Sequence, residues 1–368
     1  MALRLPMYIV DAFSERPFSG NPAAVCLLPR GVFLSDPVRQ RVAAEMNLSE
    51  TAFLEPMEDA TAAQLPDSGG DPFESASVFR LRWFTPTREV PLCGHATLAS
   101  AAVLFQDSPL AARFLAARGN LHAAISFHTL SGVLVVSSMP PVHTPSLRAT
   151  LAPAESLPAA AQPMRLSLTL PICDPVDPVP PAAADLAGPL ARACAGSLPV
   201  AEVRFCGRGG LNYVLFVLGE EVGASELEAL QPDFAAMLAA ASEEEVTGVI
   251  VCVRTPPDTA SSSSADPGLR PTLRGPAHPD VCSRFFAPWA GIEEDPVTGS
   301  AHAVLGPFWE KALLGARSDG SADQGSGIMW MRQCSRRGGE VQVEVLRSED
   351  RCRVTGAACL VLEGVLRL

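Results

Sequence analysis

Hydrophobic and polar residues alternate in short blocks along the chain, and this spacing predicts strands with few helices between them. In the first third, strands are expected over 7–13, 23–28 and 77–84, and the segment 47–54 is expected to turn into a strand. Val38, Val42 and Met46 are spaced as on one face of a helix, which predicts a helix over 35–46. The same order returns later in the chain.

The second half has an Asn before an apolar strand over 213–218, then a helix over 227–241 and a strand over 246–253. The repeat is one of order rather than of sequence identity. It indicates a duplicated fold, in which each half carries the same succession of elements.

Two short glycine segments, 91–97 and 295–302, each open a run of small and apolar residues that is typical of a buried helix. A glycine at a helix start lets a ligand approach the backbone, and the free N–H groups and the dipole there favour an anion. We therefore expect an enzyme whose two halves face one small anionic substrate.

At 368 residues, the chain is long enough for two domains. We expect an N-terminal lobe over 1–128, completed by the C-terminal strand, and a C-terminal lobe over 129–368. Three stretches, 55–75, 139–184 and 255–280, are rich in Pro, Ala, Ser and Gly and are expected to be exposed insertions.

The formal net charge of −12 argues against a nucleic-acid or anionic-membrane partner, because no basic field attracts either. No apolar run reaches the roughly 20 residues that span a bilayer, and the start of the chain has no secretory pattern. The ten cysteines lack paired zinc-site spacing. We expect reduced thiols, a cytoplasmic protein, and neither a metal site nor a phosphate loop.

Four residues in this frame could move protons. Glu50 lies at a loop-to-strand junction, where it could act first as a general base and then as a general acid. The alternative is that Glu50 caps a turn or faces solvent. His95, at a helix start, is expected as a neutral imidazole that donates or relays a proton, or as a structural residue. Asp295 is a proton carrier or a helix N-cap. Cys93 is a reactive or an inert buried thiol.

Six segments in this order resemble the phenazine-biosynthesis PhzF-like family. They are Val10-Asp11-Ala12-Phe13, Phe18 to Val25, Met46 to Phe53, Arg82 to Pro86, Glu89 to Ala99 and Glu294 to Ala301. Segments at Ser283-Arg284-Phe285-Phe286 and Arg336-Arg337-Gly338-Gly339 also sit where that family has similar ones. The resemblance runs from residue 8 to about 345.

The resemblance implies an α+β fold shared with diaminopimelate epimerase, with two pseudo-symmetric lobes, each a curved β-sheet or barrel rolled around a central helix. It places the active site between the lobes and makes the protein a cofactor-free isomerase, expected as a homodimer. Glu50 would be the principal acid/base, helped by His95 and Asp295. The residues expected to bind a small carboxylate substrate are Asn21, Ser49, Cys93, Gly94, Gly299 and Ser300. Ser49 would orient the carboxylate of Glu50.

One departure from related enzymes matters. Diaminopimelate epimerases and proline racemases use two cysteines, and Cys93 matches the first, while Thr298 stands at the place of the second. Threonine is a poor base near neutral pH, which disfavours a symmetric two-thiol racemase. A Cys93-dependent epimerase or dehydratase of an amino or imino acid remains an alternative, as does a non-catalytic binding protein on the same fold.

Overall fold

The computed structural model describes residues 2–57, 73, 76–106, 124–139, 164–175, 181–207, 211–255, 278–313 and 327–368. They form two compact units: unit 1 is Met1–Leu168 with Thr355–Leu368, and unit 2 is Thr169–Val354. The chain passes from one unit to the other within strand β8 (Met164–Pro171) and again within strand β16 (Arg351–Arg367).

Unit 1 is a β-sheet that closes on itself. Besides parts of β8 and β16, its strands are β1 (Arg4–Ala12), β2 (Asn21–Leu27), β3 (Glu50–Pro56), β4 (Val78–Phe84), β5 (Glu89–Val90), β6 (Ala124–Thr129) and β7 (Gly132–Met139). The sheet order is β1-β2-β3-β4-β6-β7-β8-β16, and β16 also pairs with β1. Closure removes exposed strand edges.

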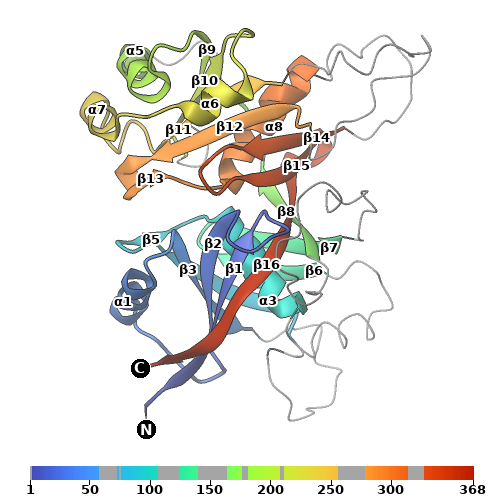
Figure 1. The fold of residues 1–368 in the computed structure, drawn as a ribbon. Coiled ribbons are helices and arrows are strands. Elements are labelled where there is room, and N and C mark those ends of the chain that lie inside the picture. The colour runs from blue at the N-terminus through green and yellow to red at the C-terminus, as the bar shows by residue number, and fades with distance from the viewer. Residues whose placement is uncertain are drawn as a thin grey trace, which may run out of the picture. The chain divides into compact units, whose positions relative to one another are not determined.

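Helix α3 (Gly94–Gln106) is enclosed by this sheet, and every residue from Gly94 to Phe105 is buried. It contacts β1, β2, β3 and β7, as Figure 1 shows in cyan among the blue strands. A helix buried on all sides must be apolar all round, which explains its run of alanines and leucines. The shorter helix α1 (Asp36–Met46) packs against β3 and β4.

Unit 2 repeats the pairing pattern of unit 1. Its strands are β9 (Val200–Cys206), β10 (Tyr213–Leu218), β11 (Gly248–Arg254), β12 (Val281–Ala287), β13 (Ile292–Glu294), β14 (Ile328–Gln333) and β15 (Gly339–Leu346). β10 pairs with β11 in parallel, as β2 does with β3, and β12 pairs with β14 in parallel, as β4 does with β6. The expected duplication is therefore present in the sheet topology.

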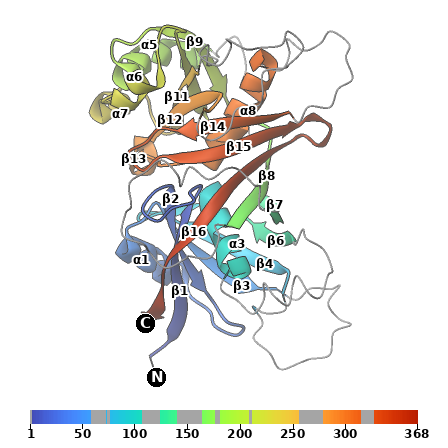
Figure 2. The same ribbon diagram turned by 45° about the vertical axis from the view of Figure 1, so that its right-hand side comes forward.

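Helix α8 (Gly299–Leu313) is the counterpart of α3 in chain order, and Gly306 marks its close approach to the sheet. A Cβ at Gly306 would lie 2.7 Å from Val343 Cγ1 of β15. Helices α5 (Pro181–Ala195), α6 (Ala224–Ala229) and α7 (Phe234–Ala240) gather together, as Figure 2 shows, and pack on a core that includes Phe216 and Phe286. Short 3-10 turns cover 288–290 and 347–349.

None of the helices in the described ranges combines the length and the apolar character needed to cross a bilayer.

Two expectations about local structure are wrong. The single helix expected over 227–241 is two helices, because Pro232 disfavours a helical residue before it and Asp233 caps α7 by accepting from the Ala236 N–H at 2.9 Å. The exposed insertion expected over 139–184 contains β8, whose alternate leucines at 166, 168 and 170 are buried.

The other parts of the three expected insertions fall largely on 58–72, 140–163, 176–180 and 256–277, which lie outside the described residues.

Candidate active site

Glu50 is the first residue of β3, beside Ala23 of the parallel strand β2. Helix α1 ends just before it, where Asn47 takes a left-handed conformation with φ of 49°. The chain therefore turns sharply from the helix into β3. Glu50 is 8% exposed, so the alternative of a solvent-facing carboxylate does not apply.

Ser49 and Asn21 lie next to this junction. The Ser49 hydroxyl donates to Asn21 Oδ1 at 3.3 Å, and Asn21 is fully buried at the start of β2. Gly20 precedes Asn21 with φ of +70°, and a Cβ there would lie 2.2 Å from the Ala12 carbonyl oxygen. Only glycine fits this position, so the tight approach of Gly20 to β1 fixes where Asn21 begins the strand.

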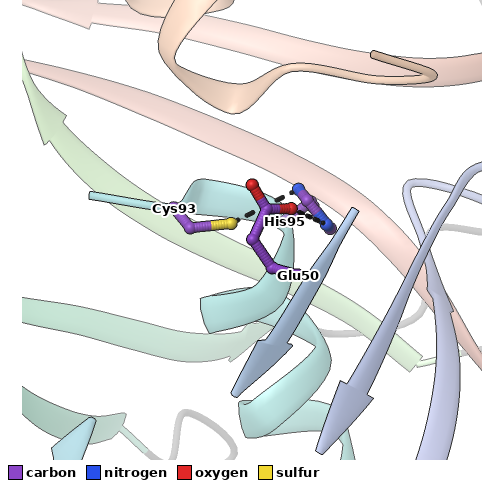
Figure 3. A group of neighbouring side chains, drawn as sticks. All are labelled: Glu50, Cys93 and His95. Atoms are coloured by element: carbon purple, nitrogen blue, oxygen red, sulfur yellow. Dashed lines mark hydrogen bonds and ion pairs between the residues drawn. The ribbon is translucent and has the colours of Figure 1, made fainter. Parts of the chain in front are cut away.

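His95 and Cys93 reach Glu50 from the start of α3. His95 Nε2 lies 3.1 Å from Glu50 Oε2, and Cys93 Sγ lies 3.5 Å from His95 Nδ1. In Figure 3, dashed lines join the imidazole both to the Glu50 carboxylate and to the Cys93 thiol. All three side chains are buried, so the fold brings together one acid, one imidazole and one thiol out of water.

The charge state of His95 differs from the expected neutral imidazole. Burial acts to lower its pKa, but the neighbouring Cys93 and Glu50 together outweigh burial, and the pKa lies well above 6.5. The direction of this shift favours an imidazolium in contact with Glu50.

Cys93 is a thiol rather than a thiolate near neutral pH. Burial raises its pKa to about 11, and the charge of Glu50 adds to that rise. A thiol in this state is a weak base, which bears on the choice between the two enzymatic hypotheses.

Glu50, Cys93 and His95 each offer one ligand atom, and these atoms lie within 4.8 Å of one another. The sequence shows no metal-site spacing for them, because Glu50 is 43 positions before Cys93 in the chain. The three residues could nevertheless hold a metal ion together.

A second polar cluster lies in unit 2, before α8. The Thr298 hydroxyl donates to Asp295 Oδ2, and the Thr298 N–H donates to Gln333 Oε1 at 2.8 Å. Gln333 Nε2 donates to the Asp295 carbonyl at 2.6 Å. Gln333 is fully buried at the end of β14 and joins that strand to the turn that leads into Gly299.

Ser300, in the first turn of α8, is held by a residue that the sequence analysis did not single out. The Tyr213 hydroxyl lies 2.9 Å from Ser300 Oγ. Burial raises the pKa of Tyr213, so the phenol is neutral and can donate or accept there. Tyr213 follows Asn212 at the strand start, a position that could have drawn attention, whereas nothing in the sequence around Gln333 indicates its contacts.

His302, one turn into α8, makes the stability of the protein depend on pH. It is fully buried, and its Nδ1 lies 2.7 Å from the Thr298 carbonyl oxygen, so Nδ1 carries the proton and donates. Burial lowers its pKa to about 4. Between pH 6.5 and pH 4, the unfolded chain binds a proton that the folded protein does not, so the free energy of unfolding falls as the pH falls.

We expect the titration of His302 to lower the free energy of unfolding by about 2 kcal/mol between pH 7 and pH 5. Urea unfolding of the wild type and of His302→Gln at both pH values measures it, because the variant lacks the titrating ring. The stability advantage of the wild type over the variant should shrink by about that amount at pH 5. An advantage that stays constant would contradict a buried neutral His302.

Comparisons with known proteins agree along the whole chain. The family model described as "Phenazine biosynthesis-like protein" (PhzC-PhzF) matches residues 10–364. A phenazine biosynthesis-like domain-containing protein from Homo sapiens is 35% identical over 364 residues, covering 99% of each chain. A protein named as an uncharacterized isomerase from Halalkalibacterium halodurans is 31% identical, covering 99% of this chain and 98% of its own.

Solved structures show the fold. A PhzF family protein from Enterococcus faecalis is 30% identical, with a TM-score of 0.62 and full coverage of both chains. A Pseudomonas aeruginosa protein described as a predicted epimerase is 19% identical, with a TM-score of 0.60, covering 98% of this chain and 99% of that one. The expected α+β fold of the diaminopimelate epimerase type is thereby confirmed.

Proposed function

This chain belongs to the phenazine biosynthesis-like protein family and is an isomerase, and we propose that it moves a proton within a small carboxylate-bearing metabolite. In this proposal Glu50 is the acid/base and the reaction uses no cofactor. The observation that carries the proposal is the buried contact between Glu50 and His95.

The proposed step needs only a base and a compensating charge. The Glu50 carboxylate accepts a proton from a substrate carbon, and the electron pair of that C–H bond moves into the substrate. Glu50 then returns the proton at another carbon, so that no atom or electron is gained or lost. The His95 imidazolium supports the step because its fixed positive charge stabilises negative charge that develops nearby in a dry site.

The remaining site residues are proposed for binding. Backbone N–H groups at the helix starts, around Gly94 and around Gly299 and Ser300, would bind substrate carboxylate. Asp295 would be a further proton carrier in unit 2. Asn21 and Ser49 are proposed to contact the substrate beside Glu50, which their hydrogen bond next to that residue supports.

Solvent-deuterium incorporation tests the proposal. The full-length protein is incubated in D2O with a panel of small carboxylates, and mass spectrometry reads the deuterium gained at carbon. Exchange in one compound, lost in Glu50→Gln, would support proton transfer at carbon. A panel without exchange would count against the proposal and favour a non-catalytic binding protein on this fold.

A second candidate function is a Cys93-dependent epimerase or dehydratase of an amino or imino acid. The contact of Cys93 Sγ with His95 Nδ1 favours it, because a positive charge on the ring acts to lower the pKa of the thiol. The raised pKa of Cys93 opposes it.

Cys93→Ser separates the two candidates. We expect exchange to fall by less than about 10-fold, because Glu50 and not the thiol takes the proton. Rates for the variant and the wild type on the same exchanging compound measure this. A loss of about 100-fold or more, with Glu50→Gln remaining active, would transfer the role of base to Cys93.

We also propose that the protein works in the cytoplasm as a homodimer. All ten cysteines are free thiols, which supports a reducing compartment. The homodimer rests on the family resemblance, and sedimentation of the purified protein tests it.

A further inference from the structure

We propose that Glu50, Cys93 and His95 form a binding site for one Zn²⁺ ion, and that zinc bound there inhibits the isomerase. The inhibition rests on the proposed function, because it requires Glu50 to be the acid/base. The site itself rests on the geometry and chemistry of the three side chains (Figure 3).

The donor set suits zinc. A thiolate, an imidazole nitrogen and a carboxylate oxygen are the three ligand types that zinc takes in proteins, whereas Mg²⁺ and Ca²⁺ prefer oxygen alone. Two anionic ligands, Glu50 and the Cys93 thiolate, also offset the charge of a divalent cation, with neutral His95 as third ligand. A buried site of this kind carries no net charge when the ion is bound.

At each ring nitrogen of His95, one neighbouring donor atom lies at a distance close to that in a zinc site. Tetrahedral coordination with ordinary bond lengths places an oxygen and a nitrogen ligand about 3.3 Å apart and a sulfur and a nitrogen ligand about 3.6 Å apart. The structure has 3.1 Å from Glu50 Oε2 to His95 Nε2 and 3.5 Å from Cys93 Sγ to His95 Nδ1. A single ion would bind only one of the two ring nitrogens. The Glu50 oxygen or the Cys93 sulfur, whichever lies beside the other nitrogen, must then move toward the ion by about 1 Å.

Two of the donor atoms are buried without a hydrogen bond. Glu50 Oε2 and His95 Nε2 face each other, but neither makes a hydrogen bond of good geometry. Buried polar atoms are nearly always paired, and a metal ion that replaces the proton between these two atoms would give each of them a ligand bond.

The backbone holds the donors in place. Glu50 begins β3, and Cys93 and His95 flank Gly94 at the start of α3. The Thr97 hydroxyl donates to the Cys93 carbonyl at 2.5 Å, which ties Cys93 to the first turn of the helix. Three protein ligands leave a fourth position open for water or a substrate carboxylate, as in exchangeable zinc sites.

Zinc at this position blocks the proposed chemistry for a simple reason. A Glu50 oxygen that coordinates the ion is no longer a free base, and the metal replaces the proton on His95. We therefore expect one equivalent of zinc to abolish the exchange activity and a chelator to restore it.

The test titrates Zn²⁺ into the metal-free full-length protein against a chromophoric chelator, which reads binding without any substrate. We expect one tight site in the wild type, weakened by at least about 10-fold in Cys93→Ser. Cys359→Ser is the matched control, because Cys359 is a partly exposed thiol elsewhere in unit 1, and it should keep the site.

Cobalt(II) gives a second readout that needs no variant. A thiolate ligand produces a sulfur-to-metal charge-transfer absorption, which we expect in the wild-type protein at one equivalent. Absence of that band, or equal zinc affinity in Cys93→Ser and the wild type, would overturn the site.

Exchange measured with and without zinc separates this proposal from the proposed function. Exchange that continues with one equivalent bound at the site would overturn the inhibition and leave the isomerase proposal in place. Zinc bound through Cys93 in a protein that shows no exchange even when metal-free would support the site and remove the proposed function.

Discussion

Replacing Glu50 with Gln is expected to reduce solvent-deuterium exchange by at least about 100-fold, in the range that general acid–base groups contribute. The amide keeps the size of the side chain but cannot accept a proton from carbon. It also removes the negative charge beside His95, 3.1 Å away, and so removes one cause that raises the pKa of the imidazole. Both effects act against the proposed step.

The matched control is Glu45→Gln, the same substitution at an exposed position of α1, in the same unit. It should exchange at the wild-type rate. Circular dichroism and urea unfolding of both variants verify that they are folded. A Glu50→Gln variant that keeps exchange within about 10-fold of the wild type would show that another group is the base.

Replacing Gln333 with Met should lower the free energy of unfolding by about 2–5 kcal/mol. Met has a similar length but no amide, so the Thr298 N–H loses its acceptor and the Asp295 carbonyl loses a donor, both beside a fully buried side chain. A buried polar group left without its partner costs about 1–3 kcal/mol.

Urea unfolding measures the loss, and hydrogen exchange locates it, because the Thr298 amide should exchange faster in the variant. Gln231→Met is the control, since Gln231 is exposed in unit 2 and its side-chain contact with the Ala229 carbonyl is long, at 3.4 Å. We expect that variant to change stability by less than about 0.5 kcal/mol. Equal effects of the two substitutions would mean that the Gln333 hydrogen bonds add no stability.

Local sequence patterns predicted much of the fold because they depend on neighbours in the chain. Apolar spacing located α1, and the glycine segments located the first residues of α3 and α8. The same reasoning failed over 227–241, where apolar residues continue across Pro232 but the backbone cannot. Composition also gives no sign of β8, although Leu166, Leu168 and Leu170 alternate along it as in a strand with one buried face.

The contacts of the candidate site were only partly accessible from sequence. Glu50 and His95 stand out in the sequence by their places at a strand junction and a helix start and by the family resemblance of their segments, and the structure places them together. Gln333 was missed because its partner Asp295 is 38 positions away in the chain. No periodicity connects residues that meet only when β14 packs beside the turn before α8.

By itself, the sequence determined the family, the order of the elements and the two glycine helix starts, because each of these is written in local spacing and in motifs. Tertiary structure alone decided the chemical state of the side chains. Folding raises the pKa of His95 by setting the ring beside Cys93 and Glu50, and it raises the pKa of Cys93 by removing the thiol from water. A pKa depends on burial and on charges a few ångströms away, and those neighbours come from distant parts of the chain.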